Sequence, residues 1–137
     1  MPHVPLIRYA GNAIVPQPFA IRQARACGFA VEGDRAKMQA LCDKTLNLAP
    51  ATRYRVLSST VLITFMRMER LASTQPAAAA CGSFAETELN VSLLLAAEEK
   101  HGPVWLPHRL VWNMPYLWLD SSSAMIAGRD IYGFPKQ

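Results

Sequence analysis

The sequence predicts a mainly β fold with flanking helices, of the α+β class. Three segments, residues 54–68, 84–96 and 104–119, are rich in the β-branched and aromatic residues that favour strands. Only residues 34–47 show helical apolar spacing early in the chain. The chain has 137 residues, 51% hydrophobic and 18% charged, which suits one domain with a conventional buried core.

The N-terminal part predicts an arm followed by a short strand and a helix. Four prolines among the first twenty residues exclude regular helix and most central-strand pairing, so we interpret residues 1–27 as a Pro-rich arm. Residues 28–32 are a short apolar strand candidate. Asp34 then stands as the N-cap of a helix that we expect to end near Asn47, ahead of Pro50.

The rest of the chain predicts strands and one last helix. Residues 54–68 and 84–96 should be strands joined by a loop at residues 73–82. Prolines within residues 104–119 indicate short, bent or edge strands there. Asp120 or Ser121 can cap a final helix that runs through Tyr132, and Gly133 followed by Pro135 is a usual stop signal.

Several classes of function are excluded by composition and by missing motifs. The net charge of +4 comes from scattered rather than clustered arginines, which gives no footprint for nucleic acid. Three cysteines without a C-x-x-C pair and three histidines without H-E-x-x-H spacing give no disulfide framework or metal site. No phosphate loop, G-x-S-x-G motif, signal peptide or apolar run of bilayer length occurs. We therefore expect a cytoplasmic protein that needs no cofactor, nucleic acid or membrane.

Two stretches resemble known active-site motifs. The closing run GRDIYGFPKQ, residues 128–137, closely resembles the segment of the acetoacetate decarboxylase family in which Gly-Arg-Glu precedes Gly-x-Pro-Lys. The run GSFAE, residues 82–86, is similar to the family's Gly-x-Tyr/Phe-x-Glu strand. The resemblance implies an antiparallel β-barrel or cone formed by residues 28–137. It also implies that Lys136 is the nucleophile that forms a Schiff base, with Glu86 as the acidic partner.

A lysine nucleophile must lose its proton at neutral pH. With a pKa of about 10.4, only about one free lysine in a few thousand is the neutral amine at pH 7. A neighbouring cation or burial can lower that pKa, and acetoacetate decarboxylase is itself an established example of such activation. Because Gln137 is neutral, we expect burial to supply the shift here. We expect Phe84, Met114, Tyr116 and Arg129 to line the substrate pocket.

The implied activity is decarboxylation of a small β-keto acid that resembles acetoacetate. The same imine also supports aldol cleavage or dehydration, so an imine-forming aldolase or dehydratase remains an alternative, as does a family member that binds small molecules without turnover. The chain is about half as long as the family it resembles. We therefore expect it to be the N-terminal portion of a barrel that a second polypeptide segment completes, and we expect homo-oligomers.

Overall fold

A computed structural model describes residues 17–49, 51–126, 128 and 135. It confirms the α+β class, with an antiparallel sheet and short helices. The elements in chain order are β1 (Phe19–Glu32), α1 (Arg35–Thr45), β2 (Thr52–Ser73), the 3-10 helix η1 (Pro76–Cys81), β3 (Phe84–His101), β4 (Val104–Leu119) and α2 (Ser122–Ile126).

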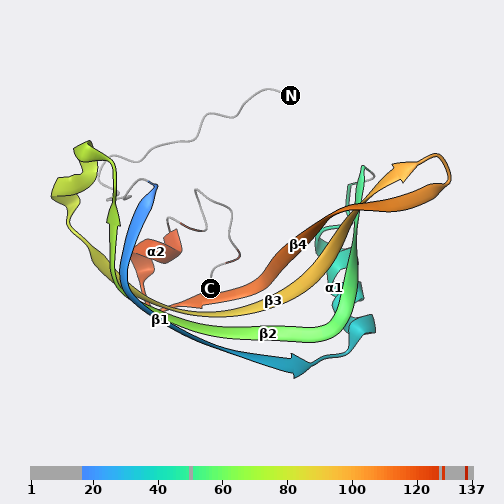
Figure 1. Ribbon diagram of the computed structural model, residues 1–137, viewed down its shortest axis with the longest axis horizontal. Helices are drawn as coiled ribbons and strands as arrows, with labels where there is room; N and C mark the ends of the chain where they lie inside the picture. The colour runs from blue at the N-terminus through green and yellow to red at the C-terminus, as the bar shows by residue number, and fades with distance from the viewer. Residues whose placement is uncertain (1–16, 50, 127, 129–134, 136–137) are drawn as a thin grey trace.

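The four strands form one open sheet in the order β1-β2-β3-β4, and each strand pairs antiparallel with its neighbour in the chain. The sheet curls into a trough, with α1 at one end and α2 on the concave side (Figure 1). Within the described residues the sheet does not close, so β1 and β4 are its two edges. This is an incomplete barrel of the kind that the sequence predicts.

The curl coincides with irregular pairing. The register between β2 and β3 shifts between Val56 and Val61, where β2 carries extra residues. β4 shifts against β3 at two places, close to Pro107 and Pro115. Such bulges bend a strand and increase its twist. Of the short, bent or edge strands predicted for residues 104–119, the structure shows one continuous strand, β4, at an edge of the described sheet and bulged near both prolines. An edge strand tolerates proline, so β4 continues through both.

Helix α1 builds the main core at one end of the trough. Asp34 caps it as predicted, since its Oδ1 accepts hydrogen bonds from the backbone amides of Ala36 at 2.9 Å and Lys37 at 3.1 Å. The helix then buries one face against β2 and β3, and burial raises the pKa of the Cys42 thiol. The buried core cluster comprises Met38, Cys42, Val56, Leu93 and Leu95.

Other boundaries differ from those expected. β1 begins at Phe19, so residues 19–27, which we assigned to the arm, pair with β2 instead. The predicted loop at residues 73–82 mostly forms η1. Ser121 rather than Asp120 caps α2, because its Oγ accepts from the amide of Ala124 at 3.3 Å. The rest of the helix predicted to reach Tyr132, and its Gly133 stop, lie outside the described residues apart from Gly128.

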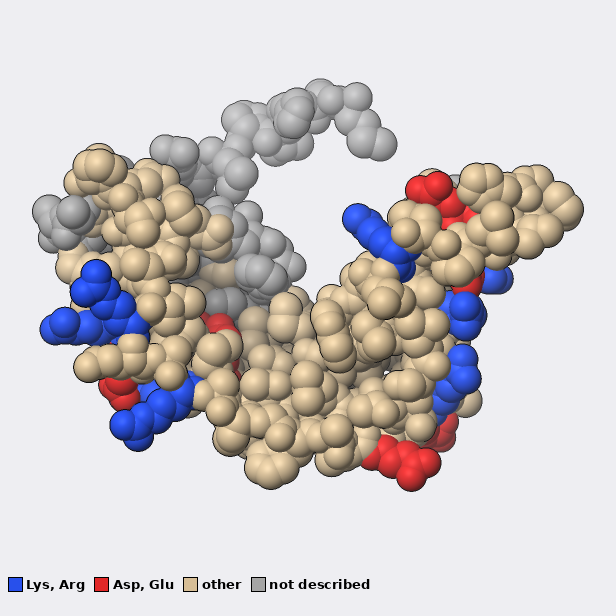
Figure 2. All heavy atoms as spheres, in the orientation of Figure 1, with Lys and Arg blue, Asp and Glu red and all other residues tan. Residues whose placement is uncertain are grey.

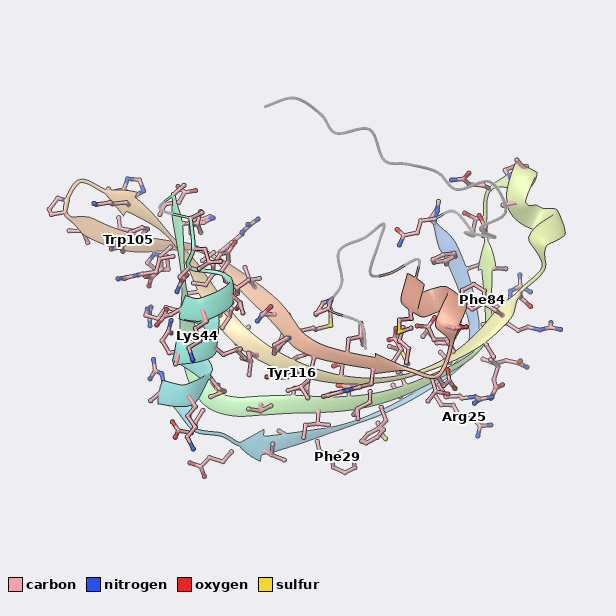
Figure 3. The ribbon with its side chains drawn as sticks, turned by 180° about the vertical axis from the view of Figure 1, so that it is seen from behind. Arg25, Phe29, Lys44, Phe84, Trp105 and Tyr116 are labelled. Carbon is pink, nitrogen blue, oxygen red and sulfur yellow. The ribbon has the colours of Figure 1, made fainter. Side chains whose placement is uncertain are left out.

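The sheet has an inner and an outer face. Phe29 points away from the trough (Figure 3), and the register carries this outer face across to Ile63, Val91 and Tyr116. Because side chains alternate along a strand, Glu86, Glu88 and Asn90 of β3 belong to the inner face. The inner face is therefore polar along β3, whereas the outer face at these positions is apolar or aromatic.

Candidate functional site

Glu86 is buried on the inner face of the sheet. It lies near the start of β3, after a turn in which Gly82 has φ of +74°, a conformation that glycine adopts without strain. Its neighbour across the strands is Met68, and only 3% of Glu86 is exposed. A carboxylate is seldom buried this deeply unless it has a partner or a functional role.

Glu86 begins a polar row along the inner face of β3. Alternation places Glu88, Asn90 and Ser92 after it on the same side, and the last two are buried. The Ser92 hydroxyl donates a hydrogen bond of 3.1 Å to Asn90 Oδ1. Buried Leu117 of β4 stands opposite Asn90. The inner face thus combines buried polar atoms with apolar walls, as small-molecule sites do.

Hydrogen bonds at the junction between β4 and α2 hold the chain where it leaves the sheet for the concave side. Thr87 and Asp120 exchange two hydrogen bonds: the Thr87 amide donates to Asp120 Oδ1 at 2.7 Å, and the Asp120 amide donates to the Thr87 carbonyl at 3.2 Å. Hydrogen bonding of the Asp120 carboxylate by the Thr87 side chain, and then by the Thr87 amide, is the main reason why the pKa of Asp120 lies below its usual value. The two exchanged bonds tie the chain just before α2 to β3, the strand that carries Glu86.

The segment after α2 contains the predicted nucleophile. Lys136 and Arg129 both lie outside the described residues, so their placement stays a prediction. In this segment, Gly128 is buried and Pro135 is exposed.

Of the other predicted pocket residues, Phe84 lies on the inner face of the sheet and Tyr116 on the outer face. Phe84 lies two residues before Glu86, hence on the same face, and its ring meets Phe19 edge to face at 6.1 Å. Met114 is half-buried in the irregular stretch between Asn113 and Tyr116, which pair with Leu93 and Val91 respectively.

Tyr116 does not share a face with Glu86. It pairs with Val91 on the outer face and stacks on Trp118, with ring centroids 5.7 Å apart. The alternation within β4 alone could not reveal this, because the face of Tyr116 depends on its register against β3.

A cluster of three charged residues, which the sequence does not predict, joins the start of β2 to the end of β3. Arg53 Nη2 lies 2.6 Å from Glu98 Oε2, and Arg55 Nε lies 2.6 Å from Glu98 Oε1. Burial alone would raise the pKa of Glu98, but the hydrogen bonds and charges of the two arginines outweigh it and hold that pKa below its usual value. The Arg53 guanidinium also lies 5.0 Å from the centre of the Trp105 ring. No local motif predicts this cluster, because its members meet only through strand register.

The fold and site together define an open, barrel-type antiparallel sheet with a buried carboxylate on its inner face. A model of the acetoacetate decarboxylase family matches residues 3–137, and the chain therefore belongs to that family. A search of curated proteins finds no match. Among the described residues, no helix is both long and apolar enough to cross a membrane.

Proposed function

We propose that this chain is a lyase that decarboxylates a small β-keto acid through a Schiff base on Lys136. The observation that carries the proposal is the buried Glu86 on the inner face, in a member of a decarboxylase family. The motif that contains Lys136 follows α2, which lies on the same concave side (Figure 1). A buried acid and a lysine nucleophile are the two groups that this chemistry requires.

In the proposed reaction the neutral amine of Lys136 attacks the ketone carbon, and water leaves to give a protonated imine. The bond between the α-carbon and the carboxylate then breaks, carbon dioxide leaves, and the bonding electrons move into the imine to give an enamine. A proton returns to the α-carbon, and water hydrolyses the imine to release the ketone. Glu86 would deliver or accept the proton in these steps.

Activation of Lys136 would come from exclusion of water rather than from a second cation. Gln137 follows the lysine and brings no positive charge. A shift of about three pKa units would raise the neutral amine at pH 7 from about one molecule in a few thousand to a substantial fraction. A titration of Lys136 reactivity should therefore give a pKa well below 10.

Release of carbon dioxide is the direct test of the proposed reaction. The chain should release carbon dioxide from acetoacetate or a close β-keto acid, and Lys136→Ala should abolish the release. Lys136→Arg is a useful control because it keeps the positive charge but cannot form an imine at neutral pH. Equal release by the wild type and both variants would contradict the proposal. Imine formation followed by retro-aldol products instead of carbon dioxide would support the aldolase alternative.

A further inference from the structure

A groove on the outer face lies between β1 and β2, on the side of the sheet opposite Glu86. Its volume is about 250 Å³, and its lining includes Arg25, Cys27, Phe65, Arg67 and Thr87. Typical ligand pockets measure about 300–1,000 Å³, so this groove suits a small ligand. Figure 3 shows Arg25 on the outer side of the sheet, away from the trough.

Two arginines occupy neighbouring positions on adjacent strands in the lining of this groove. Arg25 and Arg67 are direct cross-strand partners, a position that brings Cβ atoms to within about 4.5–5.5 Å. Like charges in this position destabilise a sheet. Two carboxylates compensate Arg67, since its Nε lies 3.2 Å from Glu69 Oε1 and its Nη1 lies 4.0 Å from Asp120 Oδ2. Its Nη1 also donates to Thr87 Oγ1 at 3.1 Å. Among the described residues, Arg25 has no ion pair.

The next pair of residues gives the groove an apolar wall. Cys27 of β1 and Phe65 of β2 are direct cross-strand partners, two residues along each strand from Arg25 and Arg67 and on the same face. The Phe65 ring is held edge to face by Phe29, with ring centroids 6.4 Å apart. Phe65 nevertheless remains 44% exposed, so its free surface is available for contact. The Arg25 cation therefore stands one step along the strands from a fixed aromatic surface.

We propose that this outer groove binds a small organic carboxylate. The carboxylate would bind the Arg25 guanidinium beside Arg67 and lessen the like-charge repulsion of the pair, because guanidinium matches the planar geometry of a carboxylate. The hydrocarbon part of the ligand would cover Phe65. This site is distinct from the proposed catalytic site, since the sheet separates it from Glu86.

Ligand titration of the whole chain, followed by NMR or calorimetry, tests the proposal. Butyrate and benzoate should bind several-fold more tightly than acetate, because they add apolar contact with Phe65. Arg25→Gln should raise the dissociation constant for benzoate about tenfold or more, since it removes a charged hydrogen-bond donor. Arg70→Gln is the matched control: it removes one positive charge from the same strand pair without altering the groove lining, and affinity should change little.

Alkylation of Cys27 gives a second readout that is independent of catalysis. This thiol is exposed and lines the groove, so bound benzoate should slow its alkylation in the wild type but not in Arg25→Gln. Arg25→Gln should also match or exceed the wild type in thermal stability, because it removes a like-charge pair. Equal affinity for acetate, benzoate and inorganic phosphate, or an equal loss in Arg70→Gln, would show a general charge effect and overturn the proposal.

Discussion

At the scale of single residues, burial separates two acids that the sequence presents as similar. Glu86 and Glu88 alternate onto the same face of β3, yet Glu86 is buried and Glu88 is only half-buried. The resemblance to a family motif selected Glu86 from the sequence. Its burial could not be read from β3 alone, since it depends on the strands and helix packed around it.

Glu86→Gln should lower the rate of carbon dioxide release by about 100-fold or more, because it removes a group that transfers protons. Imine formation should persist, since Lys136 is unchanged, so borohydride should still trap a substrate adduct on the variant. Glu88→Gln is the matched control and should keep most of the activity. A Glu86→Gln variant with wild-type turnover would remove Glu86 from the mechanism.

Glu98→Gln should lower the free energy of unfolding at pH 7 by about 1–3 kcal/mol, because Arg53 and Arg55 lose a buried charged acceptor. The lower figure allows for the partial exposure of both arginines to solvent. Urea unfolding of the variant and the wild type measures the difference. Glu99→Gln is the control. Glu99 is exposed and its Oε1 lies 3.7 Å from His108 Nε2, so this variant should change the free energy of unfolding little.

The difference between Glu98→Gln and the wild type should depend on pH. The pKa of Glu98 is lower in the folded chain than its ordinary value. Its stabilising contribution is therefore complete above the unfolded pKa of about 4.3 and is lost as the pH falls through the folded pKa. The two proteins should converge in stability under strongly acidic conditions. A difference that grows as the pH falls would contradict this assignment.

At the scale of elements, a local capping signal located α1, whereas pairing between strands set the bounds of β1. Asp34 is a cap whose side chain satisfies neighbouring amides, so α1 could be located from the sequence. The extension of β1 back to Phe19 could not, because residues 19–27, of which 21–27 are exposed, become a strand only through pairing with β2. Such boundaries depend on pairing between residues that are far apart in the sequence.

Asp34→Ala should lower the free energy of unfolding by about 1 kcal/mol, because two helix amides lose their acceptor. Asp34→Asn keeps a side-chain oxygen at the cap and should retain most of the stability. The ion pair of Asp34 with Lys37 is exposed and adds little. Chemical denaturation of the three proteins measures these differences, and equal losses in both variants would argue against the capping role.

At the scale of the whole molecule, register determines which candidate residues meet. Knowledge of the strands alone assigns Tyr116 and Glu86 to neighbouring elements, but the pairing of Tyr116 with Val91 places it across the sheet. The pairing of β1 with β2 creates the outer groove, and the pairing of β2 with β3 creates the Glu98 cluster. Neither has a signature in local sequence. Figure 2 shows that the visible Lys and Arg side chains gather towards the two ends of the trough.

We expect the chain to associate through its open edges. Among the described residues, β1 and β4 each have one strand neighbour, so their outer edges carry backbone groups that can pair with another strand. Size exclusion with light scattering should give a mass above the 15.1 kDa of one chain, or a complex with a second segment of the barrel when it is supplied. A well-folded monomer that binds no such segment would contradict this expectation.

The central claim is that Lys136 forms an imine with a β-keto acid. Borohydride reduction in the presence of acetoacetate, followed by peptide mass spectrometry, tests it most directly. We predict a stable adduct on Lys136 with the mass of the reduced, decarboxylated substrate, and none on Lys136→Ala. A wild-type chain that shows turnover but no adduct on Lys136 would contradict the claim.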